Sequence, residues 1–331
     1  MALFRQLDEQ ISQMLALLNK DQRWLIVINA DPDALGAALA LRHIFKRRVL
    51  DVGIGHINEI KRPDNLSMIR FLRIPTRKII PNLAAQYDKF AMVDSQPHHN
   101  PAFDQFQFSI VIDHHPILPD KPVNAPFVDI RPKYGATATM LTEYLYNLHI
   151  RPPKLLATAL LYAIKADSAG FERSFIDADV TAFKYLTKHA DPAILNRIAR
   201  SDFLLDWMRY FSRAFYNLRR IGQGLYAHMG KVENPDILVI VADFFTRVYG
   251  VSWNAVSGEY NDKIVAIFRG DGVRRDMGKM AASLFGEIGS AGGHKGAARA
   301  EFDQAALDGK DPESFIVKKL SRGKTQNVQR I

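Results

Sequence analysis

Short apolar runs that each lead to an aspartate place the strongest constraint on how this chain can fold. The runs and the acids that follow them are 24–28 with Asp31, 90–93 with Asp94, and 109–112 with Asp113. Continuous apolar runs of this length predict buried strands. The first run is followed by an acidic turn and a small-residue helix, as at the start of a doubly wound α/β unit. We therefore expect a mainly parallel sheet with acids at its carboxyl edge.

The third run ends in an acid and two imidazoles, Asp113, His114 and His115. Pro116 then prevents further pairing in a sheet. This ending brings three groups that can bind a metal or transfer a proton to the edge where open α/β sheets bind ligands. Taken alone, the triplet also fits a loop with solvated histidines. The acids that follow the other two runs favour the functional interpretation.

Three acids, Asp31 among them, occupy positions that need an explanation. Asp31 and Asp33 flank Pro32, a spacing that can direct two carboxylates at neighbouring metal ions. Helix capping by Asp33 explains the pair equally well. Asp167 follows an apolar helix predicted over 155–164, and a carboxylate at that end opposes the helix dipole. An unfavourable charge at such a position indicates a function.

Composition limits the class of protein. The chain has 331 residues, enough for two domains with separate cores. It has no cysteine, which excludes disulfides and thiolate chemistry and favours a cytoplasmic location. No apolar run is long enough to span a bilayer, so we expect no membrane association. The net charge of +9 fits nucleotides or nucleic acid as partners, and it also fits a merely basic soluble protein.

The second half of the chain has a different pattern. Helical spacing gives way to strands predicted at 237–241 and 263–268, and to helices predicted at 248–257 and 277–285. We divide the chain into an N-terminal domain over 1–190, a helical linker over 191–221 and a smaller α/β domain over 222–331. A glycine-rich stretch near the end contains Gly292, Gly293 and His294, which in isolation is typical of a flexible loop.

Taken together, the acidic segments resemble the four ordered motifs of the DHH phosphoesterases. The matching segments are Asp31-Pro32-Asp33-Ala34-Leu35-Gly36, Asp94, Asp113-His114-His115 and Asp167-Ser168-Ala169-Gly170-Phe171. The family includes RecJ-type exonucleases, nanoRNases, phosphoadenosine-phosphate phosphatases, cyclic-dinucleotide phosphodiesterases, exopolyphosphatases and manganese pyrophosphatases. Gly292, Gly293 and His294 resemble the signature of the C-terminal domain that accompanies this family.

The resemblance implies two divalent ions, Mn²⁺ with Mg²⁺ or Co²⁺ as alternatives. The implied ligands are Asp31 for the first ion, Asp94 as a bridge, and Asp33, His114 and Asp167 for the second. Two ions ~3.5–4 Å apart can share a hydroxide that attacks phosphorus in line. The implied catalytic residues are Asp94, His115, which faces the phosphate, and Asp113, which orients an imidazole.

The resemblance also implies a substrate-binding role for the C-terminal domain. Its glycines let backbone amides approach an anion, and its cations contact phosphate. The residues implied are Gly292, Gly293, His294, Lys295, and one of Arg274 and Arg275.

Four positions depart from the pattern of the family. Val27 replaces a His of nanoRNase-like members, and Asn29 replaces an Asp of RecJ-like members, so the first ion loses a ligand. Lys165 stands where small or apolar residues are usual, and it either grips a phosphate or interacts with the helix dipole. Arg299 stands where Gly is usual.

Two other features allow a structural explanation. The amides at the start of a helix over 134–139 can hold a phosphate or be capped within the chain. We interpret His98 and His99 as part of a loop.

The leading hypothesis is a metal-dependent phosphoesterase that hydrolyses short oligonucleotides or small nucleotides, with polyphosphate as the alternative substrate. The rival hypothesis rests on Val27 and Asn29. It describes a nucleotide- or nucleic-acid-binding protein that kept the fold and lost efficient catalysis. A monomer and a homodimer are both left open.

Overall fold

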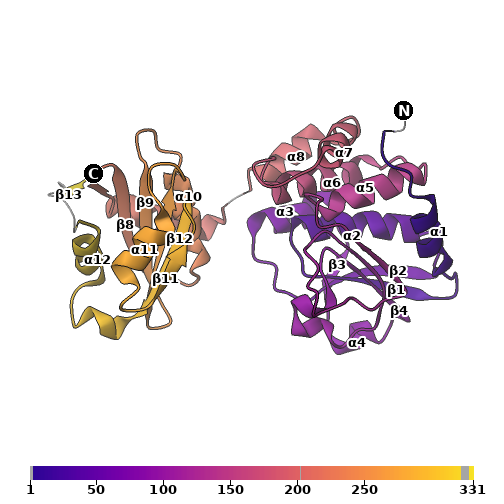
Figure 1. Cartoon of the computed structure of the whole chain (residues 1–331), viewed down its shortest axis with the longest axis horizontal. Helices are drawn as coiled ribbons and strands as arrows, with labels where there is room; N and C mark the ends of the chain where they lie inside the picture. Colours follow the sequence, from indigo (N-terminus) through magenta and orange to yellow (C-terminus); the bar gives the residue numbers. More distant parts are fainter. Residues whose placement is uncertain (1–2, 202, 322–327) are drawn as a thin grey trace. The chain divides into compact units, whose positions relative to one another are not determined.

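The computed structural model describes residues 3–201, 203–321 and 328–331, and the chain forms two compact units, Met1–Asp202 and Phe203–Ile331 (Figure 1). The stretch 191–221, expected to be a linker, is divided between them. Helix α8 (Pro192–Ala199) packs in the first unit against α3 (Pro63–Leu72) and α6 (Lys154–Asp167). Helix α9 (Met208–Tyr216) packs in the second unit against strand β8 (Gly224–Lys231).

The first unit is built on a six-stranded sheet in the order β3-β2-β1-β4-β5-β6, with all neighbouring strands parallel. Its strands are β1 (Arg23–Ile28), β2 (Asp51–His56), β3 (Thr76–Lys78), β4 (Lys89–Val93), β5 (Phe108–Asp113) and β6 (Phe127–Ile130). The three runs that lead to aspartates are β1, β4 and β5, which are neighbours. Because parallel strands end at one edge, the acids that follow them meet there. The predicted parallel sheet is confirmed.

Helices cover both faces of this sheet, which confirms the doubly wound architecture (Figure 1). On one face, α2 (Pro32–Phe45) packs over β1, and α5 (Thr137–Asn147) and α6 pack against α2 in the same core, which includes Trp24, Ile26 and Ile28 of β1. The other face buries Leu25 and Val27 beneath the segment that contains α4 (Pro81–Ala84) and two 3₁₀ turns, η1 (Pro97–His99) and η2 (Pro101–Phe103). The unit also contains α1 (Asp8–Ala16), α3 and α7 (Asp177–Thr187). No helix in the described part of the chain is long and apolar enough to cross a membrane.

Helices α2 and α6 approach closely because Gly36 has no side chain. A Cβ atom added there would lie 2.9 Å from Ala163 Cβ and 3.2 Å from the carbonyl oxygen of Ala159, both on α6. The first half of α2 is buried throughout. This packing positions the start of α2, and with it Asp31 and Asp33, at the carboxyl edge of the sheet.

The second unit contains a seven-stranded sheet in the order β11-β12-β10-β9-β8-β7-β13. Its strands are β7 (Arg219–Ile221), β8, β9 (Trp253–Tyr260), β10 (Lys263–Gly270), β11 (Ser290–Gly293), β12 (Ala297–Asp303) and β13 (Val328–Arg330). Strands β8 and β9 are parallel and are connected through α10 (Asp236–Phe245), which packs with α9 on one face. Helices α11 (Met277–Phe285) and α12 (Pro312–Ser321) pack on the other.

Two elements predicted for the second unit were wrong. The β-branched run at 237–241 is not a strand but part of α10, where Ile237, Leu238 and Val241 are buried at helical spacing. The stretch 248–257 is not a helix, because Gly250 adopts a φ of 80° and strand β9 begins shortly afterwards. A short apolar run has the same appearance in a buried strand and in a buried helix, so packing decided both cases.

We predict that Gly36→Ala lowers the free energy of unfolding of the first unit by about 1–3 kcal/mol, because the added methyl overpacks the contact between α2 and α6. Chemical denaturation followed by circular dichroism measures this change. Gly292→Ala is the matched control, since a Cβ atom there meets nothing within 4 Å, and it should change stability by less than about 0.5 kcal/mol. Equal stability of both variants would contradict the prediction.

Candidate metal centre

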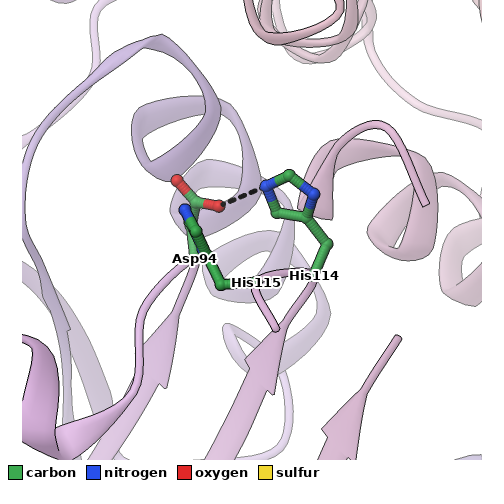
Figure 2. A group of neighbouring side chains, drawn as sticks. All are labelled: Asp94, His114 and His115. Atoms are coloured by element: carbon green, nitrogen blue, oxygen red, sulfur yellow. Dashed lines mark ion pairs between the residues drawn. The ribbon is translucent and has the colours of Figure 1, made fainter. Parts of the chain in front are cut away.

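Three carboxylates converge on the imidazole of His114 at the carboxyl edge of the first sheet. Its Nε2 atom lies 3.1 Å from Asp167 Oδ2, 3.5 Å from Asp94 Oδ1 and 4.0 Å from Asp33 Oδ2. His114 follows β5, Asp94 follows β4, Asp33 lies in the first turn of α2, and Asp167 ends α6. Figure 2 shows Asp94, His114 and His115 gathered beyond the ends of neighbouring strands. Residues far apart in the sequence therefore form one cluster.

The carboxylate of Asp33 is held by the start of helix α5. Its two oxygens accept hydrogen bonds from the backbone N–H groups of Thr137 (2.6 Å) and Ala138 (2.8 Å). Burial raises the pKa of Asp33 to about 7, although the charge of His114 acts in the opposite direction. Of the two explanations offered for the amides at 134–139, the structure thus shows capping within the chain, by an acid from another helix.

Asp31, and not Asp33, is the N-cap of α2. Its Oδ1 atom accepts a hydrogen bond from the backbone N–H of Ala34 at 2.8 Å. Burial raises the pKa of Asp31, against the lowering effect of that hydrogen bond. Its carboxylate also interacts with the carboxyl group of Asp94. Asp31 therefore caps a helix and borders the cluster around His114.

The backbone of Asp94 is left-handed, with a φ of 58°, which is uncommon for a residue other than glycine. Its Oδ1 atom accepts a hydrogen bond from the hydroxyl of Thr137 at 2.9 Å. Burial raises the pKa of Asp94 well above its usual value, and the charges of Asp33 and Asp31 raise it further. A buried acid among other acids favours a bound cation, because a positive charge offsets both burial and repulsion.

The imidazole of His114 tests whether a metal ion fits here. Its Nδ1 atom donates a hydrogen bond to the carbonyl oxygen of Tyr134 at 3.0 Å. Nε2 is buried and makes no hydrogen bond to any described residue, although the three carboxylates surround it. Burial lowers the pKa of His114, but Asp167 and Asp33 raise it to about 9. A divalent ion can replace the proton on Nε2, so the donor set fits such an ion.

A second set of contacts orients His115 beside this cluster. Its Nδ1 atom donates to Asp113 Oδ1 at 2.8 Å, and the side-chain amide of Gln96 donates to Asp113 Oδ2 at 2.8 Å. Asp113 and Gln96 are both fully buried. The hydrogen bond to Asp113 raises the pKa of His115. Sequence reasoning missed Gln96, because an amide in a turn two residues after an acid carries no recognisable signal.

The histidines interpreted as part of a loop, His98 and His99, form turn η1 next to this chain of contacts. The ring of His99 lies 5.4 Å from the ring of His115, centroid to centroid. Its Nδ1 atom accepts a hydrogen bond from the backbone N–H of Gln96 at 3.2 Å. His99 therefore packs beside His115, a proximity that the sequence did not indicate.

The glycine-rich segment of the second unit packs against the start of helix α11. The carbonyl oxygens of Lys295 and His294 each accept a hydrogen bond at 3.1 Å, from the backbone N–H groups of Met277 and Gly278. A Cβ atom on Gly278 would lie 2.5 Å from the carbonyl oxygen of Gly293. This close approach leaves the side chains of His294 and Lys295 exposed.

The two candidate arginines of the second unit have different surroundings. Both Arg274 and Arg275 are exposed. Arg274 Nε lies 3.9 Å from Asp271 Oδ2, whereas the guanidinium of Arg275 lies 5.7 Å from the centre of the Trp253 ring. Arg275 thus has no carboxylate partner among the described residues and is the better placed of the two to meet an anion.

The positions that depart from the family pattern also differ in their surroundings. Val27 is fully buried in the apolar core, Asn29 is exposed, and Lys165 is exposed near the end of α6. Arg299 forms an ion pair with Glu301 at 2.7 Å. Among the described residues, neither of the two cations, Lys165 and Arg299, forms an ion pair with a carboxylate of the cluster around His114.

Comparison with known proteins finds a similarity to one family in part of the chain. Residues 23–164 match the DHH family, N-terminal domain. The first unit thus contains a segment similar to the DHH N-terminal domain. The matched segment includes Asp31, Asp33, Asp94 and His114, and Asp167 lies just beyond it.

A longer part of the sequence also has a relative. An uncharacterized protein, MJ1633, of Methanocaldococcus jannaschii is 32% identical over 305 residues, which cover 91% of this chain and 62% of that protein. The chain thus spans less than two thirds of the relative's length. An exopolyphosphatase-related protein from Bacteroides fragilis has a similar fold, with a TM-score of 0.63, 15% identity and 96% of each chain covered. At that identity the similarity concerns the fold alone.

For the phosphoesterase activity that we propose below, we predict that Gln96→Ala lowers kcat about 10–100-fold, because residues that orient reacting groups through one intermediate contact have effects of this size. Without the amide, Asp113 loses a hydrogen bond and His115 loses its fixed orientation. Hydrolysis of bis(p-nitrophenyl) phosphate with added Mn²⁺ measures the effect. Gln105→Ala removes an exposed amide from the same stretch and should leave kcat unchanged. Equal rates for both variants would show that Gln96 has no such role.

We predict that Mn²⁺ raises the Tm of the protein. At a hundredfold excess of Mn²⁺ over its Kd, the free energy of unfolding should increase by about 2.7 kcal/mol. Asp94→Asn should abolish this shift. Its metal-free Tm should equal or exceed that of the wild type, because the substitution relieves repulsion and keeps an acceptor for Thr137. Differential scanning fluorimetry gives both values, with the exposed Asp104→Asn as the control. A wild-type Tm that does not change when Mn²⁺ or another divalent ion is added would contradict the prediction.

Proposed function

We propose that this protein is a metal-dependent phosphoesterase whose metal ligands are Asp31, Asp33, Asp94, His114 and Asp167. The observation that supports it most strongly is the buried Nε2 atom of His114, which faces three carboxylates from three segments of the chain. Mn²⁺ is the proposed ion, with Mg²⁺ or Co²⁺ as alternatives, because carboxylate oxygens with one imidazole suit all three.

Divalent ions at such a site supply charge that stabilises phosphate oxygens and lower the pKa of a water molecule. The residues of the chain itself orient and hold the substrate. Asp113 holds Nδ1 of His115, so the free nitrogen of that ring is Nε2. The side chain of His115 is 44% exposed, which leaves it accessible to a phosphate group. Because its pKa is raised, the ring can bind the phosphate as a cation or donate a proton to the leaving oxygen.

The proposed substrates are short oligonucleotides or small nucleotides. Exposed cationic or hydrogen-bonding side chains on the second unit suit phosphate contacts, namely His294, Lys295 and Arg275, with the backbone of Gly292 and Gly293 beside them. The name of the exopolyphosphatase-related protein with a similar fold keeps polyphosphate as an alternative substrate. We assign the metal site to the first unit and substrate binding to the second.

A nucleotide-binding protein with weakened catalysis is the second candidate. It is favoured by Val27, which lies in the apolar core, and by the neutral side chain of Asn29. Neither residue supplies an acidic or imidazole ligand to an ion held by Asp31. The two candidates differ in turnover, because both predict binding and only the first predicts hydrolysis.

We expect hydrolysis of at least one member of a panel made of short oligonucleotides, cyclic dinucleotides, phosphoadenosine phosphate and polyphosphate, assayed with Mn²⁺. Asp94→Ala should reduce that rate by at least about 10³-fold, because it removes the carboxylate that we propose both metal ions share. Asp104→Ala removes an exposed acid and should retain the wild-type rate. Nucleotide binding without metal-dependent turnover on any substrate would favour the second candidate.

A further inference from the structure

The amino-terminal edge of the first sheet, opposite the metal centre, carries a concentrated group of cations. Helix α2 starts at the carboxyl edge and returns, so the residues after Phe45 lie where strands β1 and β4 begin. We call the group the amino-edge patch, and it consists of Lys20, His43, Lys46, Arg47, Arg48 and Lys89. None of these residues belongs to the family motifs or to the proposed substrate site.

The amino-edge patch extends over two adjoining hollows. One, of about 510 Å³, is lined by His43, Lys46, Arg47, Arg48 and Ile150. The other, of about 810 Å³, has Lys20 and Lys89 in its lining, again with Arg47 and Arg48. Because these two arginines line both hollows, the positive charge is continuous from one to the other. Such an array suits an anion with several charged groups better than a single phosphate.

The cations of the amino-edge patch are not paired directly with acids in the described part of the first unit. Within residues 3–201, its lysines and arginines form no ion pair with a carboxylate. Burial lowers the pKa of His43, and the cations Lys46, Arg47 and Arg42 lower it further. The potential at His43 is therefore set by other cations.

Helix structure accounts for part of this group but not for all of it. Cations near the end of α2 interact favourably with the helix dipole, and Arg48 donates a hydrogen bond to the carbonyl oxygen of Ile44. Lys46 and Arg47 are exposed and make no side-chain hydrogen bond to a described residue. Lys20 and Lys89 belong to other segments, so the dipole of α2 does not explain them.

The lining of the hollows indicates how an anion would be recognised. No phenylalanine, tyrosine or tryptophan is among the described residues that line them. Without these larger rings, the hollows lack the aromatic platforms on which single-strand-binding proteins commonly stack bases. Lysine and arginine contact phosphate groups irrespective of base sequence. The ligand would therefore be held mainly through its phosphates.

We propose that the amino-edge patch is a second binding site, which holds a chain of phosphate groups through charge and without reading bases. A single-stranded nucleic acid and inorganic polyphosphate both present such a chain. The patch and the metal centre lie at opposite ends of six-residue strands such as β1, which corresponds to a separation of about 20 Å. The proposal therefore does not rest on the catalytic activity of the metal centre.

The test measures binding of a labelled oligothymidylate to the full-length protein, in EDTA so that no turnover occurs. Lys46→Glu with Arg47→Glu should weaken binding about tenfold or more. It should also reduce the slope of log K against log salt by about 1.4, since each single-strand phosphate contact contributes about 0.7. Arg220→Glu with Lys318→Glu changes the net charge equally on exposed residues of the second unit, and it should alter affinity by less than about twofold.

Further measurements decide the outcome. If the variant with two glutamates has a lowered Tm, the variant with Lys46→Gln and Arg47→Gln is used in its place. This neutral variant should also lose affinity for the oligothymidylate. Inorganic polyphosphate is then added as a competitor of the labelled oligothymidylate. Competition shows that the patch also binds polyphosphate, and no competition shows that it binds the nucleic acid only. Binding of either phosphate chain at the patch supports the proposal. Equal losses in the patch and control variants would overturn it. Binding of phosphatidylserine vesicles at the patch, with no binding of either phosphate chain, would also overturn it.

Discussion

The repulsion among buried carboxylates at the carboxyl edge is the constraint on which the first unit depends. Burial raises the pKa of Asp31, Asp33 and Asp94, and neighbouring acids raise each one further. Each carboxylate is therefore matched by a donor or a cation. Asp33 receives two backbone amides, Asp94 receives the hydroxyl of Thr137, and Asp31 receives a backbone amide of its own helix. His114 completes the set, and its buried Nε2 atom, which makes no hydrogen bond to a described residue, is a place where a larger positive charge can enter.

The winding of the first unit explains why acids and cations separate to opposite edges. In a parallel sheet each helix that connects two strands starts near the carboxyl ends of the strands and finishes near their amino ends. Helix α6 connects no two strands of this sheet, and it ends at the carboxyl edge with Asp167. Acids are favourable at helix starts and cations at helix ends, because each charge opposes the local end of the helix dipole. The starts of α2 and α5 accordingly hold Asp31 and Asp33, and the end of α2 leads into Lys46, Arg47 and Arg48. The same topology thus underlies both the metal site that we propose at one edge and the anion site that we propose at the other.

The second unit shows where local patterns stop being informative. The run at 237–241 is β-branched and apolar, and both features favour a strand, yet it forms α10 and covers one face of the sheet. Strand β9 lies in a stretch whose spacing suggested a helix. Both segments are buried in the core beside strands distant in the sequence, such as β10 and β8. Their state depends on those neighbours, which a window along one segment does not contain.

The sequence by itself determined the parallel sheet of the first unit, the acids at the ends of its strands and the identity of the residues around His114. These features are local, since each is a short run with a characteristic ending, and the order of the runs constrains how they pair. Only the tertiary structure decided that Asp33 caps α5, that Gln96 holds Asp113, and that cations from three segments line one edge. The contact between Asp33 and Thr137 joins residues 104 positions apart, and that between Gln96 and Asp113 joins residues 17 apart. Contacts of this kind depend on packing between elements, and no pattern within a single element encodes them.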